Sequence, residues 1–194
     1  HAALQGHSDV ARALLQNGAT SELDEDGNSP LHLSAQTKFA AAPLTMLLAT
    51  SANLHLRNKR GETPLHAMAA KGRREAMRHL LAEGADIDSK DDRFWTPLNV
   101  ACASGHVGIA ELLTEHSVQS GGPCVGLAAR AGHIEMVKFL LLKKFDQELL
   151  EGYSPQHWAE IAGHHAVVQL LTAPVDRRPS DVLQQPIFSR TSRA

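Results

Sequence analysis

Leucine recurs at a fixed interval along this chain of 194 residues. The positions Leu14, Leu47, Leu80 and Leu113 are evenly spaced, and Leu140 and Leu171 follow after somewhat shorter gaps. The period is about 33 residues, and internal repetition of this length indicates small structural units that stack on one another. A unit of this size cannot bury an apolar face alone, so the chain is expected to form an array in which neighbouring units share a core.

Each period also carries a pair that predicts the start of a helix, a Ser or Thr followed by Pro. The pair opens the segments Ser29-Pro30-Leu31-His32, Thr63-Pro64-Leu65-His66, Thr96-Pro97-Leu98-Asn99 and Ser154-Pro155-Gln156-His157. The hydroxyl oxygen accepts a hydrogen bond from an unpaired backbone N–H, and proline fits the first helical position because its missing donor is not needed there. A glycine then ends this short helix, often with a histidine after it, as at Gly105-His106.

A second helix in each unit shows apolar residues at helical spacing, as in residues 134–141. A glycine stop follows it, as at Gly84, and an extended polar segment such as 86–95 closes the unit. This period, together with the sequence T-P-L-H, resembles the ankyrin-repeat family, and the resemblance covers about residues 1–173. It implies an all-α solenoid of stacked helix-turn-helix units with β-hairpin fingers. The units are expected at roughly 1–23, 24–57, 58–90, 91–117, 118–148 and 149–173, followed by a degenerate cap and flexible tail at 174–194.

The repeat pattern departs from regularity between the fourth and fifth units. The interval from Leu113 to Pro123 is shorter than the matching interval from Leu80 to Thr96, and six residues of the expected finger are missing. The fifth unit also lacks the T-P-L-H sequence. We expect a short Gly121-Gly122 link there, with no projecting hairpin.

Two other units are irregular. In the second, Lys38-Phe39 stand where Gly-His is usual, and Pro43 fits the first turn of a second helix better than its interior. In the sixth, Gln156 replaces a core Leu and Glu160 replaces an Ala. Polar replacements of this kind are expected in a terminal unit, which faces water on one side.

The chemically versatile residues favour a structural interpretation. Seven of the twelve histidines occupy the two motif positions, where the family resemblance implies hydrogen bonds between neighbouring units. Cys102 is expected to be a small buried residue, whereas Cys124 stands at a helix start, where a thiolate would be favoured. The sequence contains no P-loop, nucleophile elbow or H-E-x-x-H motif. We therefore expect no enzyme activity, no cofactor and no metal.

Composition narrows the setting. Lys and Arg number 19 against 21 Asp and Glu, a balance that argues against nucleic-acid binding. The longest apolar stretch, 39–49, is too short for membrane insertion. Two cysteines are too few for a disulfide framework, which favours an intracellular protein, cytoplasmic or nuclear. The chain opens in mid-pattern without an initiator Met, so it is interpreted as a monomeric excerpt of a longer protein.

The fingers carry the candidate binding residues, because the family resemblance implies that finger tips and exposed positions on the first helices hold a protein partner on a concave face. Trp and Arg dominate interface energetics. We expect an exposed Trp95 at the centre of this surface. The other candidates are Arg60, Arg93, Tyr153, Asp92, Lys59 and Asp26.

Phe94 is unusual for a finger, because the matching positions carry Gly27, Gly61 and Gly152. A positive φ would be costly for an aromatic residue. Either this finger bends differently or the aromatic pair is retained for contact.

These features favour a non-catalytic protein-interaction module, a scaffold or an adaptor. Alternatives are a regulatory or targeting segment of a larger enzyme such as a kinase or acyltransferase, a ubiquitin-ligase substrate receptor, an ion-channel segment with a cytosolic ligand pocket, and a methyl-lysine reader. The sequence Arg177-Arg178-Pro179-Ser180 resembles a basophilic kinase site, which would place a phosphate on Ser180.

Overall fold

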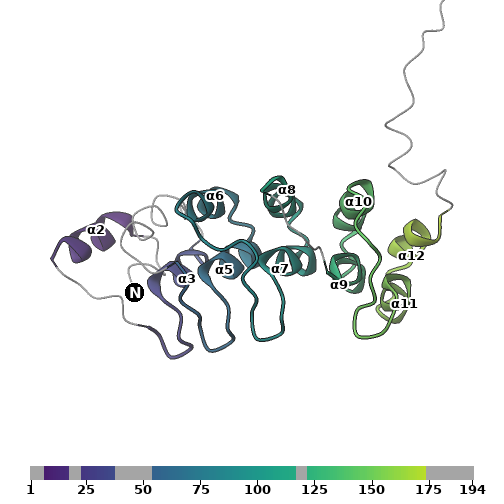
Figure 1. Ribbon diagram of the computed structural model, residues 1–194, viewed down its shortest axis with the longest axis horizontal. Helices are drawn as coiled ribbons and strands as arrows, with labels where there is room; N and C mark the ends of the chain where they lie inside the picture. Colours follow the sequence, from purple (N-terminus) through teal and green to yellow (C-terminus); the bar gives the residue numbers. More distant parts are fainter. Residues whose placement is uncertain (1–6, 18–22, 38–53, 117–121, 174–194) are drawn as a thin grey trace, which may run out of the picture.

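The computed structural model describes residues 7–17, 23–37, 54–116 and 122–173, and the helices in these ranges form an elongated array (Figure 1). The first helices of successive units follow one another along one side. They are α3 (Pro30–Ser34), α5 (Pro64–Lys71), α7 (Pro97–Ser104), α9 (Cys124–Arg130) and α11 (Pro155–Ile161). The second helices are α2 (Ser8–Gln16), α6 (Arg74–Ala82), α8 (Val107–Glu115), α10 (Ile134–Leu142) and α12 (His165–Thr172). Each first helix packs against the next, from α3 through to α11.

The Ser/Thr-Pro pairs start helices as predicted. Proline occupies the first turn of α3, α5, α7 and α11. The side chains of Ser29, Thr96 and Ser154 each accept a hydrogen bond from the backbone N–H three residues later. These bonds satisfy donors that a helix leaves unpaired at its beginning.

The Gly-His motif joins neighbouring units. Gly72 and Gly105 end α5 and α7 in the left-handed conformation, with φ of 66° and 74°. The imidazole of the following unit lies against each glycine: a Cβ on Gly105 would stand 2.7 Å from the His133 ring. The Nε2 of His133 also donates to the Ala103 carbonyl at 3.1 Å, and His106 makes the matching bond to Ala70 at 3.2 Å. The predicted structural role of these two histidines is confirmed.

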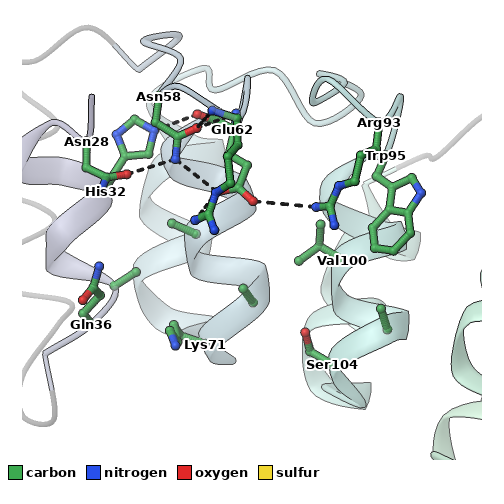
Figure 2. A pocket seen from close by; sticks show the side chains of 15 residues that line it. Asn28, His32, Gln36, Asn58, Glu62, Lys71, Arg93, Trp95, Val100 and Ser104 are labelled. Atoms are coloured by element: carbon green, nitrogen blue, oxygen red, sulfur yellow. Dashed lines mark hydrogen bonds and ion pairs between the residues drawn. The ribbon is translucent and has the colours of Figure 1, made fainter. Parts of the chain in front are cut away.

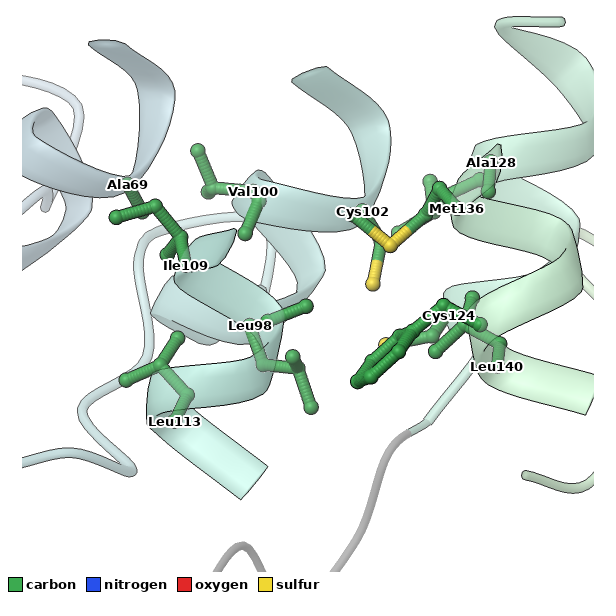
Figure 3. Packing of buried hydrophobic residues seen from close by; sticks show 14 of the residues in the cluster. Ala69, Leu98, Val100, Cys102, Ile109, Leu113, Cys124, Ala128, Met136 and Leu140 are labelled. Atoms are coloured by element: carbon green, nitrogen blue, oxygen red, sulfur yellow. The ribbon is translucent and has the colours of Figure 1, made fainter. Parts of the chain in front are cut away.

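The core between the two rows of helices is built mainly from aliphatic side chains, with Met68, Met77, Met136, Phe139 and both cysteines (Figure 3). Cys102 is fully buried, as expected, and Cys124 is fully buried as well. Burial, and then a hydrogen bond with Cys124, raises the pKa of the Cys102 thiol well above its usual value. A reactive thiolate at Cys124 is not supported, because its sulfur is shielded from solvent.

The fingers are tight turns rather than paired strands. In the second finger, the Asn58 N–H donates to the Glu62 carbonyl at 3.0 Å, and the Gly61 N–H donates to the Asn58 carbonyl at 2.9 Å. The turns at 24–28 and 91–95 have the same pair of bonds. Across the described ranges, the β structure is limited to one isolated bridge between Leu150 and Tyr153. The turns are too short to extend a ladder, so the expected β-hairpins are reduced to their tips.

The connection between the fourth and fifth units is short, as the spacing predicted. Residues 116–123 separate α8 from α9, whereas residues 83–96 separate α6 from α7 and hold the third finger. Pro123 precedes α9, which begins without a side-chain cap. The Asn99 Nδ2 donates to the Cys124 Sγ at 3.3 Å across this junction.

The sixth unit presents its polar replacements to solvent. Gln156 and Glu160 are both exposed, and the Gln156 Nε2 donates to the Glu160 Oε1 at 2.7 Å. This arrangement agrees with the expectation of a polar outer face. The expectations for Lys38-Phe39, Pro43, Gly121, Ser180 and the 174–194 tail fall outside the described residues.

Candidate functional site

A groove with a hollow of about 320 Å³ crosses the fingers and first helices of three consecutive units (Figure 2). Its lining comes from α3, α5, α7 and the turns that precede them. The lining residues are Asn28, His32, Ala35, Gln36, Asn58, Arg60, Glu62, Ala67, Ala70, Lys71, Arg93, Trp95, Val100, Ala103 and Ser104.

Small side chains on the first helices create the hollow. Ala67 and Ala70 of α5 and Ala103 of α7 face the groove and leave space between the fingers and the helix ends. Small residues at these positions also let neighbouring helices pack closely. The same sequence feature therefore produces both the stacking and the groove.

The third finger holds a preorganised cation at one wall of this groove. The Asp91 carboxylate has no exposed surface, and its Oδ2 accepts from the Arg93 Nε at 3.0 Å and Nη2 at 2.7 Å. The Arg93 guanidinium also lies over the Trp95 ring, 4.2 Å from its centroid. Burial by itself would raise the pKa of Asp91, but hydrogen bonds from the Trp95 N–H and from Arg93 outweigh it and lower that pKa. The carboxylate stays ionised and fixes the arginine in place.

The second finger supplies a more exposed cation. The Arg60 side chain is 76% exposed, and its Nη2 lies 2.9 Å from the Oε2 of Glu62, which is largely buried. The other Glu62 oxygen lies 3.7 Å from the Arg93 Nη2 (Figure 2). With exposed Lys71 at the end of α5, the lining contains three cationic side chains and one carboxylate. The groove therefore carries an excess of positive charge.

The buried histidines in this region are structural. The His32 Nε2 donates to the Glu62 carbonyl at 2.9 Å, and the His66 Nε2 donates to the Trp95 carbonyl at 2.9 Å. The Nδ1 atoms accept from the backbone N–H of Ser29 and Thr63, both at 3.2 Å. Burial lowers the pKa of both imidazoles. Both are therefore neutral links between neighbouring units, and no cluster of metal-ligating side chains occurs in the part of the chain that the structure describes.

The structure brings together three of the predicted site residues, Arg60, Arg93 and Trp95. Trp95 is half-buried rather than exposed, because it packs against the core and lies under the Arg93 guanidinium. Tyr153 does not join this group. It belongs to the sixth unit, beyond the shortened connection, and stacks on the His157 ring with centroids 4.7 Å apart.

The other three predicted residues lie on the finger tips, outside the groove lining. The Asp26 carbonyl accepts from the Lys59 N–H at 2.9 Å, and Asp92 pairs with Arg57 at 3.2 Å. These residues join adjacent fingers to one another. Their backbone and ion-pair contacts add rigidity to the stack.

Two residues of this region, one in the groove and one between units, were missed in the sequence. Lys71 ends α5 at the groove, and no motif marks it. Arg73 replaces the histidine of the Gly-His motif, and its guanidinium donates to the carbonyls of Ala35 and Thr37 in the preceding unit. Alignment of Gly72 with the other motif glycines would have assigned this linking role to Arg73.

Comparison with known proteins gives the same architecture. A family model described as ankyrin repeats (3 copies) matches residues 40–121. NF-kappa-B inhibitor alpha of Gallus gallus is 35% identical over 98 residues, which cover 49% of this chain and 31% of that protein. Ankyrin repeat protein nuc-2 of Neurospora crassa is 30% identical over 181 residues, covering 88% of this chain and 17% of the relative. Ankyrin repeat and SOCS box protein 16 of Mus musculus is 34% identical over 177 residues, covering 70% and 38%.

The repeated helix pairs, the finger turns and the groove that crosses them define a repeat solenoid. Together with these matches, they identify the chain as a member of the ankyrin-repeat family. Ankyrin repeats generally mediate protein–protein interaction and are not catalytic. The chain spans from about a sixth to two fifths of the length of these relatives. None of the helices in the described ranges has the length and apolar character needed to cross a bilayer.

Proposed function

We propose that this chain is a non-catalytic protein-interaction module, a scaffold or adaptor that holds a partner protein in the groove of its second and third fingers. The observation that carries this function is the grouping of Arg60, Lys71, Arg93 and Trp95 around a floor of alanines. Arginine and tryptophan are the residues that most often dominate interface energetics. A shallow groove with fixed walls provides such residues without loss of loop entropy on binding.

The charge of the groove favours a partner segment that carries carboxylates. Arg93 is held by Asp91 and Trp95, so little side-chain entropy is lost when it meets a partner. Arg60 and Lys71 are exposed and supply longer-range attraction. Attraction of this kind raises the association rate and weakens with salt.

Charge removal at the groove tests this function. Arg60→Ala combined with Lys71→Ala removes one ion-pair partner of the largely buried Glu62, whose carboxylate keeps the Arg93 Nη2 at 3.7 Å and the Asn58 Nδ2 at 3.1 Å. Partners are captured from a cell extract with the wild-type chain, and the Kd of each purified partner is measured by calorimetry. The double variant should weaken binding by about tenfold or more, or about 1.4 kcal/mol.

The matched control is Arg78→Ala on α6, whose side chain is also about half exposed and lies outside the groove lining. This control should bind as the wild type does. Equal affinity of the double variant and the control would show that the partner does not use the groove.

Several finer features belong to the same proposal. They include the six unit boundaries given above and a degenerate cap at 174–194. We also propose that a partner makes secondary contacts with Asp26, Lys59, Asp92 and Tyr153. The chain is proposed to act as a monomer inside the cell, in the cytoplasm or nucleus, without binding nucleic acid. Sedimentation analysis tests the monomeric state, and a titration with labelled duplex DNA and RNA tests the lack of nucleic-acid binding.

A second candidate is the recognition segment of a larger protein, such as an enzyme, a ubiquitin-ligase substrate receptor or an ion channel. The observation that favours it is the length of the relatives, in which the matching stretch is the minor part. The groove would then select a substrate or regulator for the rest of that protein. The sequence of the complete transcript distinguishes this candidate from a self-contained adaptor.

A further inference from the structure

Each of the first two fingers is covered by the next one. The Lys59 N–H donates to the Asp26 carbonyl at 2.9 Å, and the Asp92 N–H donates to the Arg60 carbonyl at 3.2 Å. The fingers therefore form a short stack of turns joined by one backbone hydrogen bond at each step.

This stack stops at the third finger. The carbonyl equivalent to those of Asp26 and Arg60 belongs to Arg93, and no donor among the described residues is bonded to it. Only residues 116–123 connect α8 to α9, which is too short a segment for a full finger. In the first two fingers the equivalent carbonyl accepts a hydrogen bond from the following turn, and the Arg93 carbonyl has no such turn after it among the described residues.

A side chain at the matching glycines of the first two fingers would press on the following finger, whereas at this last step there is no following finger among the described residues. A Cβ on Gly27 would stand 3.2 Å from the Lys59 nitrogen, and a Cβ on Gly61 only 2.1 Å from the Asp92 Oδ1. Phe94 occupies the matching position of the third finger, keeps the left-handed φ of 62°, and is 78% exposed. The third finger therefore bends as the others do, and a following finger would meet the phenyl ring.

Steric freedom alone does not explain this phenylalanine. The last finger also has no successor within the described residues, and a Cβ on Gly152 would meet nothing within 4 Å, yet that position keeps glycine. A positive φ is costly for a bulky residue and is found where surrounding structure or function maintains it. Phe94 contributes little to the core, because most of its ring is exposed. Contact with another molecule accounts for an exposed ring held at this conformational cost.

A hollow of about 290 Å³ lies beside the Phe94 ring. Its lining comes from the third finger, the start of α7 and the residues before α9. The lining residues are Asp88, Lys90, Phe94, Thr96, Asn99, Gly122 and Pro123. Its two charged side chains have opposite signs, so the hollow has no preference for a charged ligand. Backbone bonding and apolar contact are the interactions that it offers.

We propose that this hollow, with Phe94 and the Arg93 carbonyl, is a second interaction surface, which we name the finger notch. It binds a tight turn of a partner polypeptide in place of the missing finger. A backbone N–H of that turn donates to the Arg93 carbonyl, as Lys59 and Asp92 do in the preceding steps. A large apolar side chain of the turn packs on the Phe94 ring.

The finger notch is separable from the groove. Phe94 lines the hollow of the notch and Arg93 and Trp95 line the groove, so the notch shares with the groove only the backbone carbonyl of Arg93. The side chains of Arg60 and Lys71 line only the groove. Variants of one surface therefore leave the other unchanged, and failure of one proposal is distinguishable from failure of the other.

The test uses a phage-displayed library of disulfide-cyclised peptides of about seven residues, long enough to form a tight turn. Peptides selected on the wild-type chain are measured against Phe94→Gly, Phe94→Leu and the Arg60→Ala/Lys71→Ala double variant. A notch-binding peptide should bind Phe94→Gly about tenfold or more weakly, because this variant lacks the ring that the bound peptide would cover. It should lose less on Phe94→Leu and nothing on the double variant.

A restored finger provides the second arm. Inserting six residues before Pro123, with the sequence of the second finger as template, returns the spacing to that between the third and fourth units. The inserted turn should fill the notch and abolish binding of the same peptides, while circular dichroism confirms that the variant is folded.

Three outcomes would overturn the assignment: selected peptides that bind Phe94→Gly as well as the wild type, selected peptides that depend on Arg60 and Lys71, or undiminished binding to the folded insertion variant. A concentration-dependent dimer that Phe94→Gly abolishes would also overturn it, because the occupant would then be a second copy of this chain.

Discussion

The stack from α3 to α7 and the segment from α9 to α12 are built from the same helix pairs but are joined differently. Within the stack, neighbouring units share an apolar core, bonds between finger turns, and a histidine that reaches the next finger. Across the α7–α9 junction, the core and the Gly-His bond to Ala103 continue. In place of the histidine link, Asn99 makes a weak contact with the Cys124 sulfur. Apolar burial and one imidazole are therefore sufficient to continue the array, whereas the finger bonds make one part of it rigid.

This difference predicts where the array separates on unfolding. In a repeat protein, stability is the sum of the units and their interfaces, so the interface with weaker links opens first. The groove lies entirely on the side with the finger bonds. The loss of a single finger thus leaves the groove within the part joined by finger bonds and leaves the C-terminal segment with fewer links to it.

The largest effect is expected from truncation in the core on either side of the junction. Leu127→Ala in α9 should cost about 2–5 kcal/mol, because the side chain is fully enclosed and leaves a cavity. Urea unfolding followed by hydrogen exchange should show residues 122–173 opening before the stack. Leu65→Ala in α5 is the matched variant and should destabilise the stack itself. If both variants unfold the whole chain in one identical transition, the two regions are not distinct.

A smaller effect is expected from His66→Asn, which copies into the stack the residue found at position 99. Asparagine can still accept from the Thr63 N–H, as Asn99 does from Thr96, but it is too short to reach the Trp95 carbonyl. Loss of this buried bond should cost about 1–3 kcal/mol in thermal or urea unfolding. The exposed His165→Asn serves as control and should leave stability unchanged. A negligible cost at His66 would contradict the view that polar links strengthen the stack.

Phe94→Gly should raise stability by about 1 kcal/mol, because glycine adopts the left-handed conformation without strain and the exposed ring contributes little packing. Gly61→Ala at the matching position should do the opposite, because alanine would be strained at the φ of 70° and its Cβ would displace the paired Asp92 and Arg57 side chains. The pair is measured by chemical denaturation. A Phe94→Gly variant that is less stable than the wild type would show that the ring is part of the fold rather than of a binding surface.

The smallest effect concerns the pH dependence of unfolding. His32 and His66 have a lowered pKa in the folded chain, because burial disfavours their charged forms. The unfolded chain therefore binds protons that the folded chain does not, and stability falls as the pH drops below the unfolded value of about 6.5. Urea unfolding at about pH 7.5 and about pH 5.5 should show this loss, reduced in His66→Asn. If His66→Asn loses as much stability between these two pH values as the wild type does, groups other than His66 cause the pH dependence.

The sequence was a good guide wherever a motif acts locally. The Ser/Thr-Pro pairs gave the starts of four helices, and the spacing between Leu113 and Pro123 located the short connection. Grouping of Arg60 and Arg93 followed from their equivalent places in successive fingers.

The same reasoning failed where the outcome depends on contacts between units. Trp95 was expected in solvent, but its ring is enclosed between Arg93 and the core. Tyr153 was expected to contribute to the surface centred on Trp95, but it lies in the sixth unit, beyond the shortened connection, and stacks on the His157 ring. Lys71 reaches the groove only through its place on α5, for which no sequence motif exists.

The pairing of each motif glycine with the imidazole of the next unit has a consequence for how such an array can change. Gly72, Gly105 and Gly132 each pack against a histidine of the following unit. The residue types at the glycine position of one repeat and at the histidine position of the next therefore depend on each other. A duplication of the fourth or the fifth unit preserves the contact, since each of these units carries both the glycine and the histidine. Exchange of a single glycine for alanine requires a simultaneous change about a full repeat away, so point substitution at these sites is blocked while growth by duplication stays open.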